Sequence, residues 1–482
     1  MRSRQLLSSG FFVASIALAG VAYAQQTEVA PMTPASTTPM PVPEDLLKAH
    51  PGGITAEQVG QRAVETSFAA KQSLETLHAA QARVDAAWAS FLPRLSGSAR
   101  YTRLSSFTVP DINLGTPAAP YIVKGSDIYP LFLNNTTLQA TLTVPISDYF
   151  LRINQQYTSA TQSADAARFD LGASRATTLS NAKVAYYTWM QMRGAVIVAV
   201  EALNDQRIHL NDAKNQFTVG NASKADVLRA ETNVASAELA VVTAENQADL
   251  AETQMRIALH APPERRLVPG EGLDGNPAPF QGSLRALVDE GMAARFEVKS
   301  ILKNAEAARK TASVQKANRY PVVSAFGDAI YADPNARLFP AQQKFFPTWD
   351  LGLQATWAPN DILTANGNAA DYDARAAALE AQAQVTREGI EVEITQSWQG
   401  LKQAEFALGS TARELASAEE AYRVARELFN NGRGTSTTLT DAERDLAGAR
   451  IDALNARVNA RIAHVKLEHA VGRDLRGIAA QP

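Results

Sequence analysis

The stretch that decides the fold is "FTVGNASKADVLRAE", residues 217–231, which interrupts a long proline-free segment. A related stretch, "FNNGRGTSTTLTDAE", occupies residues 429–443. At one offset of 212 residues, Phe217 matches Phe429, Gly220 matches Gly432, and Ala230-Glu231 match Ala442-Glu443. Glycine just beyond a helical segment is typical of the left-handed turn that ends a helix. We therefore predict two helical hairpins, with their tips at 217–223 and 429–435.

The spacing of proline divides the chain into two similar halves. Proline-free gaps of 41, 116, 41 and 122 residues follow one another, at 52–92, 146–261, 280–320 and 360–481. Long helices are confined to such gaps, because proline lacks an amide donor and clashes with the preceding turn. The order short, long, short, long predicts a duplication. We place the first structural repeat at 51–261, a Pro/Gly-rich connector at 262–283, the second repeat at 284–475 and a tail at 476–482.

The segment after each tip carries an apolar repeat of seven residues. The repeat predicts left-handed coiled-coil packing, and its many alanines allow close approach of the helix axes. Leu239, Val242, Leu250 and Ile257 lie off this seam and predict contact with a second neighbour. The seam positions are Ala230, Val234, Ala237, Val241, Ala244, Ala248, Ala251, Met255 and Ala258 in the first repeat, and Ala442, Leu446, Ala449, Ala453, Ala456, Ala460, Ala463, Leu467 and Ala470 in the second.

Segments between the helices predict strands. "TLQATLTVPI" (137–146), "WDLGLQATW" (349–357) and "LSGSARYT" (95–102) alternate apolar and polar residues with a period of two, whereas "PVVSAFGDAIY" (321–331) alternates less regularly. We predict strands at about 94–109, 135–146, 321–332 and 348–358. The alternation places Leu138, Leu142, Leu351 and Leu353 on apolar faces, and Gln139, Thr141 and Gln354 on polar faces.

Four strands cannot close a barrel within one chain. An open sheet edge in lipid leaves backbone groups unpaired, so a membrane-spanning sheet must close. Three copies of the chain would supply twelve strands, an even number typical of outer-membrane barrels. The predicted fold class is mainly α with a small β part: duplicated long-helix hairpins plus a transmembrane β-barrel with four strands per chain.

The first residues predict export. Arg2 and Arg4 precede an apolar stretch at 11–22, and Ala22-Tyr23-Ala24 fits the cleavage rule, so residues 1–24 are predicted to be a signal peptide. A Pro/Thr-rich leader follows at 25–50. The chain has no cysteine, which excludes disulfides and a lipid anchor on cysteine. No apolar run predicts a transmembrane helix, and the net charge of −3 argues against nucleic acid as a partner.

Together these features resemble the TolC-type outer-membrane efflux protein family. The resemblance covers about residues 45–475 and rests on the duplicated order of helix, two strands, long helix, hairpin and return helix. "FTVGNASKADVLRAE" looks like the family's tip motif, and "ASFLPRLSGSARY" and "ANRYPVVSAFGDAIY" look like its helix-to-strand junctions. The resemblance implies a homotrimer, whose hairpins form an α-helical barrel across the periplasm and whose strands form the barrel in outer-membrane lipid.

The resemblance also implies a function and partners. It implies the outer-membrane channel of a tripartite efflux or type I secretion system, extending into the periplasm. Such a channel is a passive duct that receives substrate from an inner-membrane transporter through a periplasmic adaptor (membrane fusion) protein. The two tips would lie at the periplasmic entrance and dock the adaptor; the candidate residues are Phe217, Val219, Gly220, Phe429 and Gly432. Phe217 and Phe429 would wedge between helices. The alternative, for the two phenylalanines and for the two glycines, is that they only cap the helix ends.

The resemblance further places an entrance gate just inside the tips. Asp226 matches a position where the family keeps charged residues that tie neighbouring helices, and Thr438 is its counterpart in the second hairpin. Asp441 lies one turn further on, and Arg433 is the candidate cationic partner. The alternative is again capping: Ser223 with Asp226, and Thr438 with Asp441, have capping-box spacing, and the helix dipole favours an acid in a first turn.

No motif points to catalysis. The six histidines are dispersed, and the sequence has no HExxH, nucleophile elbow or phosphate loop. We predict a protein that is not an enzyme and uses no cofactor or metal. The alternative function is a periplasmic coiled-coil adaptor that never inserts into a membrane, although an adaptor would be expected to show one hairpin flanked by β-rich domains.

Overall fold

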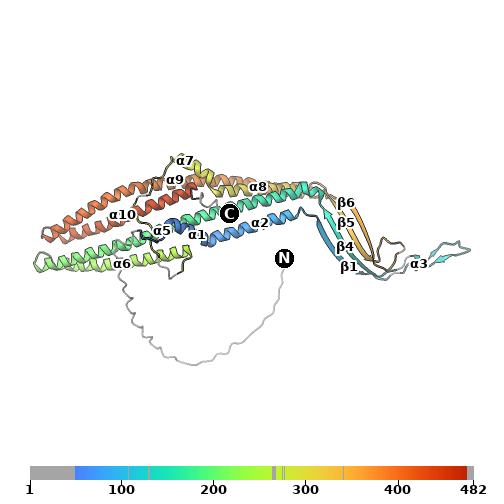
Figure 1. The fold of residues 1–482 in the computed structure, drawn as a ribbon, viewed down its shortest axis with the longest axis horizontal. Coiled ribbons are helices and arrows are strands. Elements are labelled where there is room, and N and C mark those ends of the chain that lie inside the picture. Colours follow the sequence, from blue (N-terminus) through green and yellow to red (C-terminus); the bar gives the residue numbers. More distant parts are fainter. Residues whose placement is uncertain are drawn as a thin grey trace, which may run out of the picture. The chain divides into compact units, whose positions relative to one another are not determined.

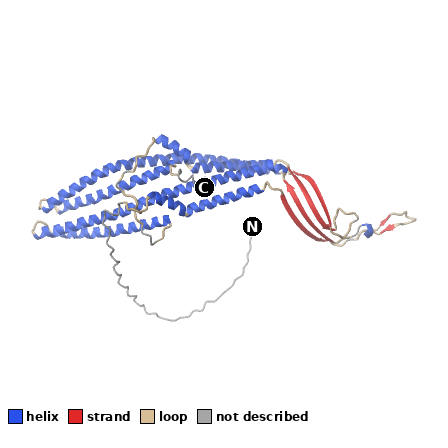
Figure 2. Cartoon of the chain, in the orientation of Figure 1, coloured by secondary structure: helices blue, strands red, loops and turns tan. Residues whose placement is uncertain are grey.

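The computed structural model describes residues 49–474 except 107, 129–130, 263–266, 274, 276 and 340, and all of them belong to one compact unit. The predicted signal peptide and tail, and nearly all of the predicted leader, lie outside the described residues. The described chain is mainly helical, with a few antiparallel strands (Figures 1 and 2).

The two halves have parallel element orders. The first contains α1 (Ala56–Thr66), α2 (Phe68–Ala89), β1 (Arg94–Arg103), β4 (Asn134–Val144), α4 (Ile146–Asp148), the π-helical turn η2 (Tyr149–Ile153), α5 (Asn154–Thr218) and α6 (Lys224–Leu259). The second contains α7 (Leu284–Ala294), α8 (Phe296–Ala317), β5 (Val322–Asp333), β6 (Phe346–Thr356), α9 (Asp361–Asn430) and α10 (Ser436–Val471). The loop after β1 adds β2 (Ile112–Asn113), β3 (Ile122–Val123) and α3 (Gly125–Ile128).

Each long helix is paired with two shorter ones. α5 and α9 have 65 and 70 residues, so each is about 100 Å long at 1.5 Å per residue. α2 and α6 pack along α5, and α8 and α10 pack along α9 (Figure 1). α5 also packs against α8 and α10, so it joins the two repeats.

The two short helices of the first repeat meet end to end through an aromatic contact. His260 follows α6 in the left-handed conformation, with φ +46°. Its ring meets the ring of Phe68, the first residue of α2, edge-on at a centroid distance of 4.8 Å. His260 Nδ1 lies 3.3 Å from Thr66 Oγ1. This contact aligns α6 with α2 along α5.

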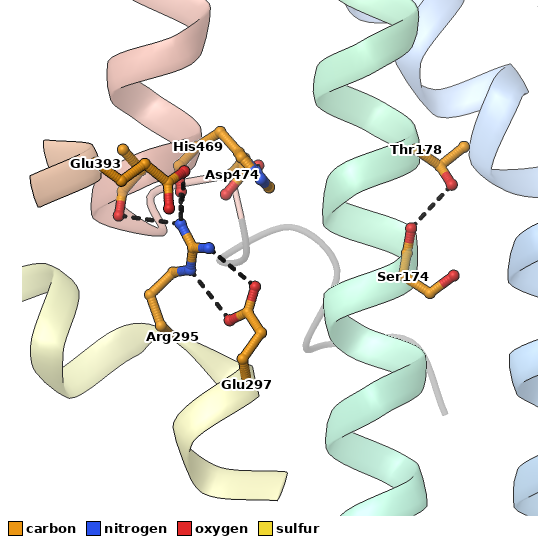
Figure 3. A network of polar contacts seen from close by, with 8 residues as sticks. Ser174, Thr178, Arg295, Glu297, Glu393, His469 and Asp474 are labelled. Carbon is orange, nitrogen blue, oxygen red and sulfur yellow. Dashed lines mark hydrogen bonds and ion pairs between the residues drawn. The ribbon is translucent and has the colours of Figure 1, made fainter. Parts of the chain in front are cut away.

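The equivalent junction in the second repeat is made by a buried arginine (Figure 3). Arg295, which precedes α8, donates to the carbonyls of His469 and Ala470 at the end of α10, both at 3.4 Å. Its guanidinium also pairs with Glu297 at 3.0 Å and with Glu393 on α9 at 3.2 Å. Burial disfavours the charge on Glu297, but the bonds from Arg295 outweigh it and hold the pKa of Glu297 below its usual range.

The predicted heptad seam is confirmed. Every predicted seam position in both return helices is buried or partly buried. The four apolar side chains predicted to lie off the seam, Leu239, Val242, Leu250 and Ile257, are all more than half exposed on α6. The α5/α6 hairpin therefore buries its alanine-rich stripe and leaves a second apolar stripe open.

The four long strands form one antiparallel sheet in the order β1-β4-β5-β6. The register aligns apolar residues across it: Leu95 lies opposite Leu142, Leu142 opposite Gly327, and Gly327 opposite Leu351. β1 and β6 are the edges of this sheet among the described strands. The sheet thus has one apolar face, one polar face and two open edges.

One predicted strand was too long. β1 ends at Arg103 rather than at residue 109, because Arg103 pairs with the first residue of β4, Asn134. Beyond that point the chain has no partner strand, and it folds into the small β2–β3 hairpin instead. The other three strands lie within two residues of the predicted ends. In the described part of the chain, no helix is long and apolar enough to cross a membrane.

Candidate functional site

The two hairpin tips, 217–223 (tip 1) and 429–435 (tip 2), have the same backbone geometry. Gly220 and Gly432 adopt φ of +83° and +68°, so the predicted left-handed turns are confirmed. In tip 1 the Asn221 amide donates to the Gln216 carbonyl at 2.9 Å, and in tip 2 the Arg433 amide donates to the Leu428 carbonyl at 2.9 Å. These bonds span five residues, as in a Schellman motif, and they satisfy carbonyls at the ends of α5 and α9.

The two tip phenylalanines differ in their surroundings. Phe429 is 4% exposed and packs in a cluster with Ala213, Ala230 and Leu439. Phe217 is 44% exposed, and the Lys224 ammonium lies 6.0 Å from its ring centroid. The prediction that both rings wedge between helices therefore holds within the chain for Phe429 alone. Phe217 and the exposed Val219 remain free to contact another molecule.

The tips contact each other. Gln216 Nε2 in the last turn of α5 donates to the Asn430 carbonyl at the end of α9, at 2.8 Å. Just inside the tips, Arg229 Nη1 on α6 donates to Thr437 Oγ1 on α10 at 3.2 Å. Because each bond joins one hairpin to the other, a movement of tip 2 away from tip 1 must break both.

Asp226 caps its own helix. Its Oδ2 accepts from the Ser223 amide at 3.0 Å, and its amide donates to Ser223 Oγ at 3.2 Å, which completes a capping box. The hydrogen bonds from the Ser223 side chain and backbone lower the pKa of Asp226, and the charges of Arg229 and His209 lower it further. Asp226 Oδ1 lies 3.6 Å from Arg229 Nη1. Asp226 is therefore ionised at neutral pH, and it lies in the first turn of α6, directly after tip 1.

In the second hairpin, the capping alternative of Thr438 with Asp441 is wrong. Thr438 does not cap α10 with Asp441: the N-cap is Thr435, whose Oγ1 accepts from the Thr438 amide at 3.1 Å. Asp441 then falls in the second turn, exposed, with Arg444 at 3.4 Å. Arg433 is exposed, and no described carboxylate forms an ion pair with it. The prediction missed Thr435 because both threonines suit an N-cap, and only the start of α10 separates them.

A buried polar contact joins α5 to α10, and no pattern in the sequence predicted it. His209 Nδ1 on α5 lies 2.9 Å from Glu443 Oε2 on α10, and both side chains are almost fully buried. Further along the same two helices, Arg450 pairs with Asp205 at 3.0 Å. The offset of 212 marked Glu443 as the counterpart of Glu231, but Glu231 is half exposed beside Lys214. The duplication does not predict that Glu443 is buried while its counterpart Glu231 is half exposed.

The sheet carries a second polar cluster, on its polar face. Gln139 Nε2 donates to Asp328 Oδ1 at 3.0 Å, and Thr141 Oγ1 also donates to this carboxylate. Asp350 lies directly opposite Asp328 and pairs with Arg337. Gln139 and Thr141 thus lie on the face that the alternation predicted.

These features define a class of protein: paired long helical hairpins with exposed tips, continued by a short sheet with one apolar face. The sequence profile of the outer membrane efflux protein family matches residues 59–259 and 287–473. The chain therefore belongs to this family, as its resemblance to the TolC type predicted.

Similar proteins span most of the chain. Nodulation protein T of Rhizobium leguminosarum bv. viciae is 22% identical over 421 residues, which cover 86% of this chain and 82% of that protein. Among solved structures, CusC has a TM-score of 0.72 at 15% identity, with 92% of this chain and 99% of CusC covered. The outer-membrane channel OprN has 0.71 at 19%, covering 86% and 89%. VceC from Vibrio cholerae has 0.70 at 17%, covering 86% and 96%. The structural likenesses show the fold.

Family membership identifies the chain as an outer-membrane efflux channel protein. The alternative of a non-inserting adaptor is thereby set aside. The family and its structural neighbours are channels rather than enzymes. In the described part of the chain, no cluster of three or more histidine or acidic side chains is arranged to hold a metal ion.

Proposed function

We propose that three copies of this chain form a passive duct. The duct runs from a periplasmic entrance at the tips, through a barrel of long helices, to a twelve-stranded barrel in the outer membrane. In this proposal the chain is exported by its signal peptide, and an inner-membrane transporter delivers substrate through a periplasmic adaptor. No part of the duct itself consumes energy.

The observation that carries this proposal is the four-stranded sheet with two open edges. β1 and β6 each present unpaired backbone groups, which cost several kcal/mol each in lipid. Pairing β6 of one copy with β1 of the next removes both edges. Three copies of four strands make twelve, within the range of outer-membrane barrels.

The sheet's apolar face suits lipid. Leu351 and Leu353 on β6 are 76% and 73% exposed, and Trp349 on the same strand is 74% exposed. Burying a leucine side chain is worth about 1.5–3 kcal/mol, so an apolar face of this extent is costly in water. The opposite face carries Gln139, Thr141 and Asp328 in mutual hydrogen bonds, as expected for a water-filled lumen.

Exposed apolar stripes on the helices fit the same assembly. On α6 the stripe is formed by Leu239, Val242, Leu250 and Ile257, as predicted for contact with a second neighbour. On α9, Val385 and Val392 are seven residues apart and exposed, and Phe406 continues the spacing after two further heptads. Seven-residue spacing favours packing against another helix of a coiled coil, and a second copy of this chain offers such helices.

Within this assembly the two tips dock the adaptor and frame the gate. Phe217 and Val219 are exposed at the end of tip 1, and the glycine turns hold both tips in a fixed shape. Arg433 lies in tip 2, and Asp226, Thr438 and Asp441 lie in the first two turns of the return helices, where neighbouring copies would approach one another. Arg433, exposed in one chain, is free to meet a carboxylate of the next.

Cysteine scanning tests the barrel, because the chain has no native cysteine. Single cysteines at Leu138 and Leu351 in native outer membranes should react with a lipid-soluble maleimide. Cysteines at Gln139 and Gln354, on the polar face, should react with a charged, water-soluble reagent instead. Equal labelling of both faces, or a monomer in crosslinked membranes, would refute the trimeric barrel.

A further inference from the structure

The most deeply buried ionisable pair at the tip end of the described hairpins is His209 with Glu443. The side chains of His209 and Glu443 are 1% and 2% exposed. His209 Nε2 lies 3.2 Å from Ser436 Oγ, so both ring nitrogens have partners on α10. The His209 ring also meets Phe429 edge-on at a centroid distance of 5.4 Å. One imidazole therefore holds the first turns of α10 and the end of α9 against α5.

The carboxylate is incompletely satisfied. Glu443 Oε2 accepts from Gln206 Nε2 at 3.0 Å in addition to His209. Glu443 Oε1 is buried and has no hydrogen-bond partner, and the same is true of Thr440 Oγ1 one turn earlier on α10. A buried carboxylate costs several kcal/mol unless a nearby positive charge compensates it. His209 is the described side chain placed to supply that charge at contact distance.

The other charged and titratable groups around the pair have partners of their own or stay neutral. On α5, Asp205 is paired with Arg450 of α10, and Asp212 is paired with Arg426 of α9 at 3.5 Å. On α6, Asp226 is ionised in its capping box. On α9, burial raises the pKa of Tyr422 to about 12, so that its phenol stays neutral. In general, aspartate and arginine side chains change charge outside the range from pH 5 to 9, whereas histidine changes charge within it.

From this geometry we propose that His209 and Glu443 form a proton-dependent clasp that holds tip 2 against tip 1. The proposal rests on the proposed duct, whose entrance the tips would surround. With His209 protonated, the clasp is a buried ion pair with no net charge. When pH rises and His209 loses its proton, the hydrogen bond persists, but Glu443 is left as a buried, uncompensated carboxylate. Separation of α10 from α5 hydrates that carboxylate, so higher pH favours the open entrance.

Spin-label distances between the tips test the clasp without requiring conduction. Thr218→Cys and Asn431→Cys place one label on each exposed tip of a chain that has no other cysteine. Labelled chains are diluted with unlabelled ones, so that distances within one chain dominate. Between pH 6 and pH 8.5 the population with separated tips should grow about tenfold relative to the closed one.

A double variant and a control variant separate the effect of charge from the effect of side-chain shape. His209→Gln and Glu443→Gln together replace the ion pair by a neutral amide pair that can still hydrogen bond. The double variant should give a tip distance that does not change with pH. The matched control is His464→Gln: His464 also lies on α10 beside an acid, Glu468 at 3.5 Å, but its ring contacts Phe280 rather than α5. This control should keep the wild-type pH response.

The outcomes are distinct. A pH response in wild type and His464→Gln that disappears in the double variant supports the clasp. An unchanged tip distance in wild type, or an equal pH response in the double variant, overturns it. Conductance of the same trimers in planar bilayers tests the duct separately: a trimer that never conducts refutes the proposed duct, while the tip distances still decide whether the pair responds to protons.

Discussion

The two tip phenylalanines, equivalent in the repeat, should respond very differently to truncation. Phe429 is 4% exposed inside a cluster formed by both hairpins. Phe→Ala at such a site costs about 3–5 kcal/mol, because the cavity adds to the lost burial. Phe217 is 44% exposed. Since burying a whole phenylalanine is worth about 1.5–3 kcal/mol, the buried half of Phe217 contributes about 1 kcal/mol.

These costs translate into local opening of the tips. Every 1.4 kcal/mol is a factor of ten in an equilibrium constant. Phe429→Ala should therefore increase opening of the last turn of α9 and the first turns of α10 by about a hundredfold or more. Phe217→Ala should increase opening at the end of α5 about fivefold.

Hydrogen–deuterium exchange of the intact assembly, followed by mass spectrometry of peptides from both tips, measures these factors. The two variants should impair efflux for different reasons. Phe217→Ala should impair efflux through lost docking although its tip loses only this small amount of protection, whereas Phe429→Ala should impair efflux only together with a large loss of protection. Equal loss of protection in the two variants would refute the assignment of Phe429 to the core and Phe217 to a contact surface.

Three further predictions concern caps, turns and the buried arginine. The lowered pKa of Asp226 means that its carboxylate stabilises α6 at neutral pH, by about 1 kcal/mol for a cap. This stabilisation is lost as pH falls through the folded-state pKa of Asp226. Asp226→Asn should therefore lower the melting temperature at pH 7 but not in strong acid. Gly432→Ala should cost about 1–2 kcal/mol because of its positive φ, whereas Gly448→Ala, inside α10 with open space around it, should be neutral or stabilising by up to about 1 kcal/mol in denaturation curves. Arg295→Met should destabilise by about 1.5–3 kcal/mol, because it removes the charged hydrogen bonds to Glu297 and to the carbonyls at the end of α10. Arg295→Lys should also have a lower melting temperature than the native chain, because lysine lacks the planar fork; a native melting temperature with lysine would contradict the geometry of Figure 3.

Much of the architecture was available from local periodicity. Proline is excluded from helix interiors for steric reasons that act within one turn, so its spacing outlined the long helices. The seven-residue stripe and the two-residue alternation reflect which side of a helix or strand is buried, and both were confirmed. The glycine turns also follow from local stereochemistry, since a positive φ is strained for other residues.

Contacts between distant segments were decided only by the tertiary structure. Glu231 and Glu443 occupy the same place in the repeat, yet Glu443 is buried because α10 packs against α5, whereas Glu231 faces outward beside Lys214. Phe217 and Phe429 diverge for the same reason. The end of β1 was set by the length of β4, its partner 31 residues along the chain.

The sequence by itself thus determined the elements of this protein, because helix, strand and turn preferences depend on near neighbours. Tertiary packing decided which of two equivalent side chains became buried between the two hairpins. A duplicated sequence folds into one asymmetric chain, in which α5 packs against the helices α8 and α10 of the second repeat as well as against α2 and α6 of its own. The clasp of His209 and Glu443 exists because of that asymmetry.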